Sequence, residues 1–187
     1  MENKSAILYD AVMCVSLPHR DMALKAIRSL QVFAAPRKIF VITARQNFAF
    51  FQSKLDSHFP LCLLDEDRVI QDITLRVLQD YFARRIGDIR RAGWYFQQFL
   101  KMSACNLPDL ADHYLIWDSD TVLLQPLTFF GHDGIVLINP KTEHHSPYFT
   151  TMQKLLGIGK QVSFSFISEH LMIKKQYMKT PGSFKGR

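Results

Sequence analysis

One stretch of the sequence constrains the fold more than any other. Residues 114–117 form an unbroken apolar run that leads directly into Asp118, Ser119 and Asp120. Such a run is typical of a strand buried on both faces of a mostly parallel sheet, where alternation of apolar and polar residues is lost. The two carboxylates then lie at the edge where open α/β sheets hold ligands, and their mutual repulsion calls for a divalent cation, hydrogen bonds or a shared proton. Oxygen ligands favour Mg²⁺ or Mn²⁺.

The rest of the chain alternates between strand and helix patterns. Strands are predicted at residues 7–17, 38–43, 61–64, 114–117 and 134–140, with a short strand or extended segment at 162–167. Helices are predicted from Asp21, as the capping residue, to just before Ala35, and at residues 47–55, 74–85, 93–105, 148–156 and 169–178. This alternation predicts an α/β fold, a Rossmann-like α/β/α layered domain with a mainly parallel central sheet. We expect residues 1–187 to form a single domain, because no internal repeat or low-complexity linker divides them.

Composition excludes several classes of protein. A hydrophobic content of 48% with 21% charged residues is ordinary for a globular chain and argues against disorder. No apolar stretch approaches the roughly 20 residues of a membrane span, and the first residues lack a secretory pattern, so a cytoplasmic location is the default expectation. The cysteines are odd in number and widely spaced among apolar residues, which favours reduced core thiols at Cys14, Cys62 and Cys105.

The net charge of +6 favours an anionic partner. Basic residues gather at Arg84, Arg85, Arg90 and Arg91, and again in residues 174–187. A nucleotide, an anionic lipid or a merely solvated basic face would each account for them. Because the sequence has no aromatic-basic repeat, zinc-finger spacing or recognition helix, nucleic acid is not an expected partner.

Three interpretations fit the pair Asp118 and Asp120. Two acids on a turn often only cap a helix or face water, although their position after a buried strand argues against this. A phosphatase-like hydrolase also carries Asp-x-Asp after a strand, and Val122 fits its pattern as well. That enzyme needs a later lysine and a further acidic pair, however, and no Asp-Asp pair follows Asp120. The third interpretation is a nucleotide-sugar transferase.

Three blocks of sequence carry a resemblance to that third class. They are residues 114–122 with Pro126, residues 93–101 and residues 163–170. In this order they resemble the GT-A type glycosyltransferases that build bacterial surface polysaccharides and lipopolysaccharide cores, and the resemblance covers residues 7 to about 178. It implies a GT-A fold, a nucleoside-diphosphate sugar as donor, a saccharide or lipid-linked saccharide as acceptor, and Mn²⁺ or Mg²⁺ as cofactor.

The resemblance also implies roles for individual residues. Asp120 would ligate the metal directly, and Asp118 would contact the ribose or reach the metal through water. Glu169, expected at the start of a helix, would be the general base that takes the proton of the acceptor hydroxyl. His170 would complete the metal shell or contact the acceptor.

Position along the chain adds further candidates for donor binding. Ser16 and Arg20 follow the first strand, and the first βα turn of such sheets borders the ligand crevice. Asp65 and Asp67 come just after the third predicted strand, and either acid would suit the hydroxyl and imino groups of a nucleoside. Lys101, from the helix before the Asp118 strand, is a candidate to meet the donor phosphate or sugar. Helix capping or solvent exposure would equally account for such residues.

The end of the chain bears on activity. Members of the resembled family usually continue past the segment of Glu169, whereas this sequence ends at Arg187, which predicts a shortened acceptor side. The alternative function is therefore an inactive remnant that binds nucleotide sugars. The basic residues near the end leave open a peripheral contact with the inner membrane, which would suit a lipid-linked acceptor.

Overall fold

The computed structural model describes residues 7–165 and 167–178. Its centre is a five-stranded sheet in the order β3-β2-β1-β4-β5. The strands are β1 (Tyr9–Val15), β2 (Ile39–Thr43), β3 (Leu61–Asp65), β4 (His113–Trp117) and β5 (His170–Lys174). β1 to β4 are mutually parallel and β5 is antiparallel to β4. The predicted α/β class and mainly parallel sheet are confirmed.

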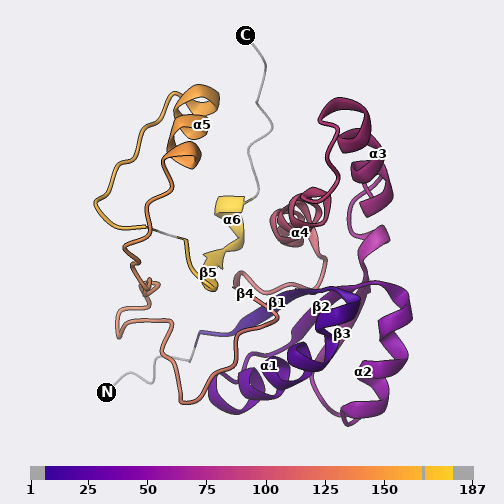
Figure 1. The fold of residues 1–187 in the computed structure, drawn as a ribbon. Helices are drawn as coiled ribbons and strands as arrows, with labels where there is room; N and C mark the ends of the chain where they lie inside the picture. Colours follow the sequence, from indigo (N-terminus) through magenta and orange to yellow (C-terminus); the bar gives the residue numbers. More distant parts are fainter. Residues whose placement is uncertain (1–6, 166, 179–187) are drawn as a thin grey trace.

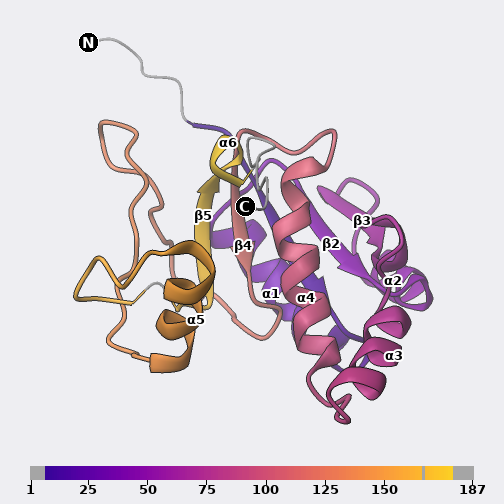
Figure 2. The same ribbon diagram turned by 90° about the horizontal axis from the view of Figure 1, so that it is seen from above.

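Helices cover both faces of this sheet (Figure 1), with α1 and α2 below it and α3 and α4 above it in that view. Figure 2 shows α5 beside the edge formed by β5, away from α2 and α3. The helices are α1 (Arg20–Phe33), α2 (Phe48–Lys54), α3 (Leu75–Arg85), α4 (Ala92–Ser103), α5 (Ser146–Leu156) and α6 (Lys175–Met178). Short 3₁₀ turns are η1 (Leu17–His19), η2 (Arg45–Asn47), η3 (Glu66–Arg68) and η4 (Ala104–Asn106). Among the described residues no helix is both long and apolar enough to cross a bilayer.

The unbroken apolar run of β1 divides its side chains between two cores, because successive residues of a strand point to opposite faces. On one face Met13 and Val15 pack with Ile27 and Leu30 of α1. On the other face Val12 and Cys14 belong to a second core, which contains Phe96 and Leu100 of α4. All three cysteines are free thiols, with Cys14 and Cys105 buried and Cys62 half-buried.

The C-terminal segment differs from the prediction of a helix over residues 169–178. Residues 170–174 instead form β5, whose ladder with β4 runs from Trp117↔His170 to His113↔Lys174. Only α6 after it is helical. An apolar segment beside the unpaired backbone of β4 gains a full hydrogen-bond ladder and buries Met172, and this tertiary pairing outweighs local helix propensity.

Three further expectations differ from the structure. Residues 134–140 form no strand: their contribution is one isolated bridge between Phe130 and Val136, and Ile135 and Leu137 are exposed. The short strand or extended segment predicted at 162–167 is represented, among its described residues, by one isolated bridge between Ser165 and Lys141. Residue 166 lies outside the described residues. Asp21 does not cap α1, because the helix begins one residue earlier, at Arg20, and Asp21 lies in its first turn.

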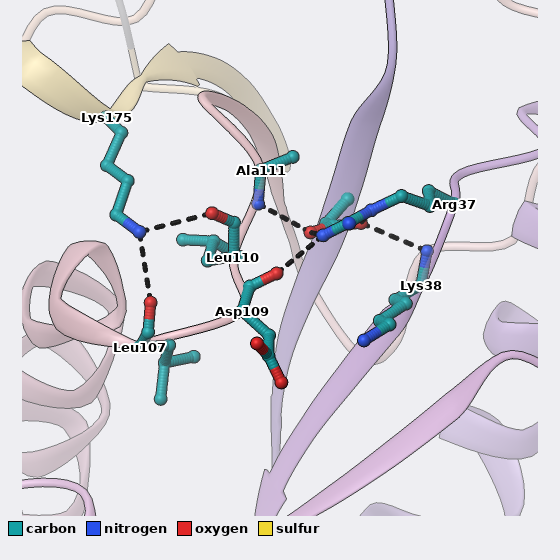
Figure 3. Close-up of polar contacts among 8 residues, drawn as sticks. Arg37, Lys38, Leu107, Asp109, Leu110, Ala111 and Lys175 are labelled. Carbon is teal, nitrogen blue, oxygen red and sulfur yellow. Dashed lines mark hydrogen bonds and ion pairs between the residues drawn. The ribbon is translucent and has the colours of Figure 1, made fainter.

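A buried carboxylate ties the amino ends of the strands together. Asp10 is fully buried in β1 and accepts hydrogen bonds from the Arg37 guanidinium at 2.8 and 2.9 Å, from Lys38 N at 3.1 Å and from Ala111 N at 2.7 Å. Figure 3 shows Arg37, Lys38 and Ala111 converging at this point. The cluster connects β1 to the segments that begin β2 and β4, at the edge opposite the acids of the 114–120 motif.

Candidate functional site

The strand order distinguishes one point at the carboxyl edge of the sheet, between β1 and β4. β1 continues through α1 to β2 on one side, whereas β4 lies on its other side and is reached through α3 and α4 on the opposite face. The neighbouring strands β1 and β4 therefore form a topological switch point, where the connections leave in opposite directions and open α/β sheets bind their ligands. Asp118 follows β4 and Ser16 follows β1, so both lie at this edge.

Asp118 is held by a lysine from the helix above the sheet. Lys101 Nζ of α4 lies 2.6 Å from Asp118 Oδ1, and both side chains are at least half-buried. The Asp118 backbone N–H donates to the carbonyl of Glu169 at 2.9 Å, which joins the motif to the start of β5. Among the described residues no donor reaches Asp118 Oδ2. The carboxylate is thus fixed in position with one oxygen available.

Asp120 lies on a tight turn that presents it to solvent. Thr121 N donates to the carbonyl of Asp118 at 3.1 Å, and the indole N–H of Trp117 donates to the Thr121 carbonyl at 2.8 Å. Ser119, between the two acids, is buried. Within residues 7–165 and 167–178, Asp120 has neither a hydrogen bond nor an ion pair through its side chain, and it is exposed. Its carboxylate is free to bind a ligand.

The antiparallel β5 brings Glu169 and His170 to the same edge. The His170 ring stacks on Trp117 with centroids 5.1 Å apart and lies edge-on to Phe129. Burial lowers the pKa of His170, against the opposing charge of Glu169, which favours the neutral imidazole that can ligate metals. Glu169 pairs with Lys141 at 3.1 Å. A hydrogen bond from its own backbone N–H, followed by that from Lys141, lowers the pKa of Glu169.

The remaining predicted site residues engage neighbours in the protein. Ser16 Oγ lies 3.0 Å from His19 Nδ1, and the Arg20 guanidinium lies 4.7 Å above the ring of Phe50. Asp65 accepts a hydrogen bond from Asp67 N at 3.3 Å, as the cap of η3. Ser16, Arg20 and Asp65 therefore stand at the correct edge, but none of them contacts Asp118, and their role in ligand binding stays a prediction.

Glu66 is the acid at this edge that sequence reasoning missed. Glu66 follows β3. Its charge acts on the buried Cys14 thiol of β1, and so do the charges of Lys101 and Asp118. These three groups therefore lie near the end of the core that contains Cys14 and Phe96. Burial, reinforced by Asp67 and Asp65, raises the pKa of Glu66 to about 7. The sequence shows three consecutive acids from Asp65 to Asp67. A short 3₁₀ turn has no repeating pattern from which to predict which of the three side chains is buried.

Glu66→Gln should change the pH dependence of stability. The pKa of Glu66 is raised in the folded state, so folding favours the protonated carboxyl. The contribution of Glu66 to stability is therefore fully present below its ordinary pKa and is lost as the pH rises through about 7. The variant should therefore gain about 2 kcal/mol in the free energy of unfolding relative to the wild type between about pH 4 and about pH 8. Urea unfolding across this range measures the difference, and a pH-independent difference would refute the assignment. Asp80→Asn, at an exposed acid of α3 that is not among the charges raising the pKa of Glu66, is the control.

The acids of the edge suit a metal ion shared with a ligand. Among residues 7–165 and 167–178, no three His, Cys, Asp or Glu side chains gather closely enough to enclose a metal ion. Mg²⁺ is commonly bound in another way, through one or two carboxylates together with substrate phosphates and water. The open oxygen of Asp118 and the unpaired carboxylate of Asp120 form a donor set of that kind, so the residues present fit a divalent cation that arrives with a phosphorylated ligand.

Comparison with protein families gives one match. The model of DUF6492, described as a family of unknown function, matches residues 20–177, which include the candidate site residues from Arg20 to His170 but not Ser16. No curated protein matches the sequence.

Comparison with solved structures shows a GT-A-like fold. The galactosyltransferase LgtC, in complex with donor and acceptor sugar analogues, matches with a TM-score of 0.53 at 12% identity, over 91% of this chain and 60% of LgtC. An active-site mutant of LgtC matches with a TM-score of 0.54 at 15% identity, over 89% of this chain and 57% of that one. Mouse xyloside xylosyltransferase 1 matches with a TM-score of 0.48 at 13% identity, over 94% and 70% of the two chains. The chain thus spans about 60% of the length of LgtC.

Proposed function

The chain belongs to the DUF6492 family, whose function is unknown, and from its carboxyl edge we propose that it is a metal-dependent glycosyltransferase. It would move a sugar from a nucleoside-diphosphate donor to a saccharide or lipid-linked saccharide, as in the synthesis of bacterial surface polysaccharide. One observation carries the proposal: Asp118 and Asp120 extend from the end of β4 at the switch point, one clamped by Lys101 and the other unpaired.

This arrangement matches the charge that sugar transfer generates. Negative charge grows on the leaving diphosphate as the bond to the anomeric carbon breaks. A divalent cation held by Asp118 and Asp120, when bound, would act as a Lewis acid toward that diphosphate. The Lys101 ammonium lies at the same point and adds positive charge for a phosphate oxygen. His170, whose ring stacks on Trp117 directly before Asp118, is a further candidate to contact the metal or the acceptor.

Glu169 is the proposed general base for a transfer that inverts the sugar's configuration. Its half-exposed carboxylate is held ionised beside Lys141. The proton of the acceptor hydroxyl would move to Glu169 as the oxygen forms its bond to the anomeric carbon. The electron pair of the breaking bond would leave with the diphosphate. A product that retains the donor's anomeric configuration would remove this role from Glu169.

Calorimetric titration with nucleoside diphosphates tests the donor site. We expect UDP or another member of a nucleotide panel to bind in the presence of Mn²⁺ and to lose affinity when EDTA replaces the metal. Asp120→Asn should weaken metal-dependent binding by about 100-fold or more, because it removes a charged ligand. Asp112→Asn is the matched control, since Asp112 is equally exposed but precedes β4 at the opposite edge. Binding that is unchanged in Asp120→Asn would refute the site.

Turnover separates this enzyme from the alternative, an inactive remnant that binds nucleotide sugars. Donor hydrolysis or sugar transfer that requires Mn²⁺ would support the enzyme. Metal-dependent binding without turnover would support the remnant. A phosphatase is disfavoured because the one strand that follows Asp120 in the described residues, β5, runs antiparallel and carries no acidic pair.

A further inference from the structure

A second surface of distinctive composition runs along α3, the turn after it and the first residues of α4. We call residues 76–95 the α3–α4 tip. It carries five arginines against two aspartates, a net charge of +3 that is half of the chain's total. Its exposed large apolar side chains are Val77, Tyr81, Ile86, Ile89, Trp94 and Tyr95. The surface therefore combines positive charge with apolar and aromatic groups that no part of the described protein covers.

The aromatic groups of the tip form one connected row. The rings of Phe82 and Tyr95 lie 5.3 Å apart, and those of Trp94 and Tyr95 lie 4.9 Å apart. Arg91 lies over Trp94, with its guanidinium carbon 5.4 Å from the ring. Phe82 is buried and anchors the row to the helices, while Trp94 is 42% exposed. The tip thus presents amphipathic rings on a rigid base.

The arginines leave their charge available to a ligand. In the part of the chain that the structure describes, Arg85 and Arg91 have no carboxylate partner, and Arg84 donates only to the backbone carbonyl of Asp80. Tyr81, Arg84 and Arg85 line an open hollow of about 420 Å³. Two guanidinium groups and a phenol at one hollow are suited to an anionic phosphate group.

The tip lies on the same side of the molecule as the candidate site. α4 runs antiparallel to β4, and its Gln97 carbonyl lies 4.0 Å from Cys14 Sγ, near the carboxyl end of β1. The residues of α4 before Gln97 therefore extend beyond the strand ends, by about 1.5 Å per residue. Figure 2 shows the turn between α3 and α4 projecting past the sheet there.

We propose that the α3–α4 tip docks this protein on an anionic lipid bilayer, with its arginines at the phosphate groups and Trp94 in the interfacial region. Tryptophan and tyrosine are the side chains enriched at membrane interfaces, and clustered arginines are attracted to anionic lipid. A nucleic acid could bind the arginines and stack on the rings of the tip. It would leave the exposed aliphatic side chains of Val77, Ile86 and Ile89 without a contact of matching chemistry. This proposal does not depend on nucleotide binding.

Co-sedimentation with vesicles tests the electrostatic half of the proposal. The full chain should bind vesicles that contain phosphatidylglycerol and should not bind vesicles of phosphatidylcholine alone. Arg84→Gln with Arg85→Gln should weaken binding by about 25-fold, about fivefold for each arginine. Lys25→Gln with Arg28→Gln, on the exposed face of α1 across the sheet, removes the same charge and should change binding by less than about twofold. Equal losses in the two pairs would refute a specific surface and indicate attraction by net charge.

Tryptophan fluorescence tests the apolar half. The chain has two tryptophans, Trp94 at the tip and Trp117, which is 1% exposed in the core. Vesicles with brominated acyl chains should quench the emission of the wild type but not that of Trp94→Phe, in which only Trp117 remains. Absence of quenching in the wild type, or equally strong binding to soluble polyglutamate or to single-stranded nucleic acid, would overturn the membrane assignment. Lost vesicle binding with intact Mn²⁺-dependent nucleotide binding would refute this proposal alone.

Discussion

Replacing Asp10 by alanine is expected to lower the free energy of unfolding by about 4 kcal/mol. The carboxylate is fully buried and accepts four hydrogen bonds. Its removal leaves the backbone N–H groups of Lys38 and Ala111 without their acceptor, and each unsatisfied buried donor costs about 1–3 kcal/mol. Arg37 is 39% exposed, so its released guanidinium recovers part of its hydration and limits the loss.

Urea unfolding monitored by circular dichroism measures this effect. Asp10→Asn keeps one acceptor oxygen and should lose about half as much, whereas Asp109→Asn is the matched control, because Asp109 is exposed and contributes its backbone carbonyl to Arg37. A loss of less than about 1 kcal/mol in the free energy of unfolding of Asp10→Ala would contradict a stabilising role for the Asp10 cluster. Since the cluster lies at the edge opposite Asp118, Mn²⁺-dependent nucleotide binding of the folded variant should not change.

The sequence could predict the strands but not the hydrogen-bonded cluster around Asp10. Continuous apolar runs identified β1, β2 and β4, and the Asp-x-Asp pair at the end of β4 lies at the predicted edge. Asp10 precedes the apolar core of its strand and resembles an ordinary polar boundary residue. Its partners Arg37 and Ala111 come from distant parts of the chain, so only the register of β1 with β2 and β4 brings them together.

The C-terminal part of the site was predictable in composition but not in geometry. The pattern of residues 169–178 is compatible with a helix, and nothing local indicates that β4 has an open side. Pairing of β5 with β4 depends on contacts more than fifty positions apart, and such contacts decide the state of a short ambiguous segment. Because β5 is an antiparallel strand and not a helix, Glu169 and His170 lie at the same edge as Asp118, whose backbone N–H donates to the Glu169 carbonyl.

Under the proposed transfer, Glu169→Gln should lower turnover by about a thousandfold and leave donor affinity unchanged. The amide matches the shape of the carboxylate but cannot take the proton of the acceptor hydroxyl. Because the Glu169 backbone carbonyl, not its side chain, accepts the hydrogen bond from Asp118 N, the substitution leaves the metal motif in place. Steady-state transfer assays combined with calorimetric nucleotide binding separate the two effects.

Two companion variants make that result specific. Glu143→Gln removes an exposed acid near Lys141 in sequence and should not affect transfer. Lys141→Gln removes the ion partner of Glu169, 3.1 Å away, and should cause a smaller loss than Glu169→Gln, about tenfold, since the carboxylate remains but is no longer held in one orientation. If Glu169→Gln transferred sugar at the wild-type rate, another group would have to take the proton. Glu169 would then be a structural partner of Lys141 at the entrance to β5.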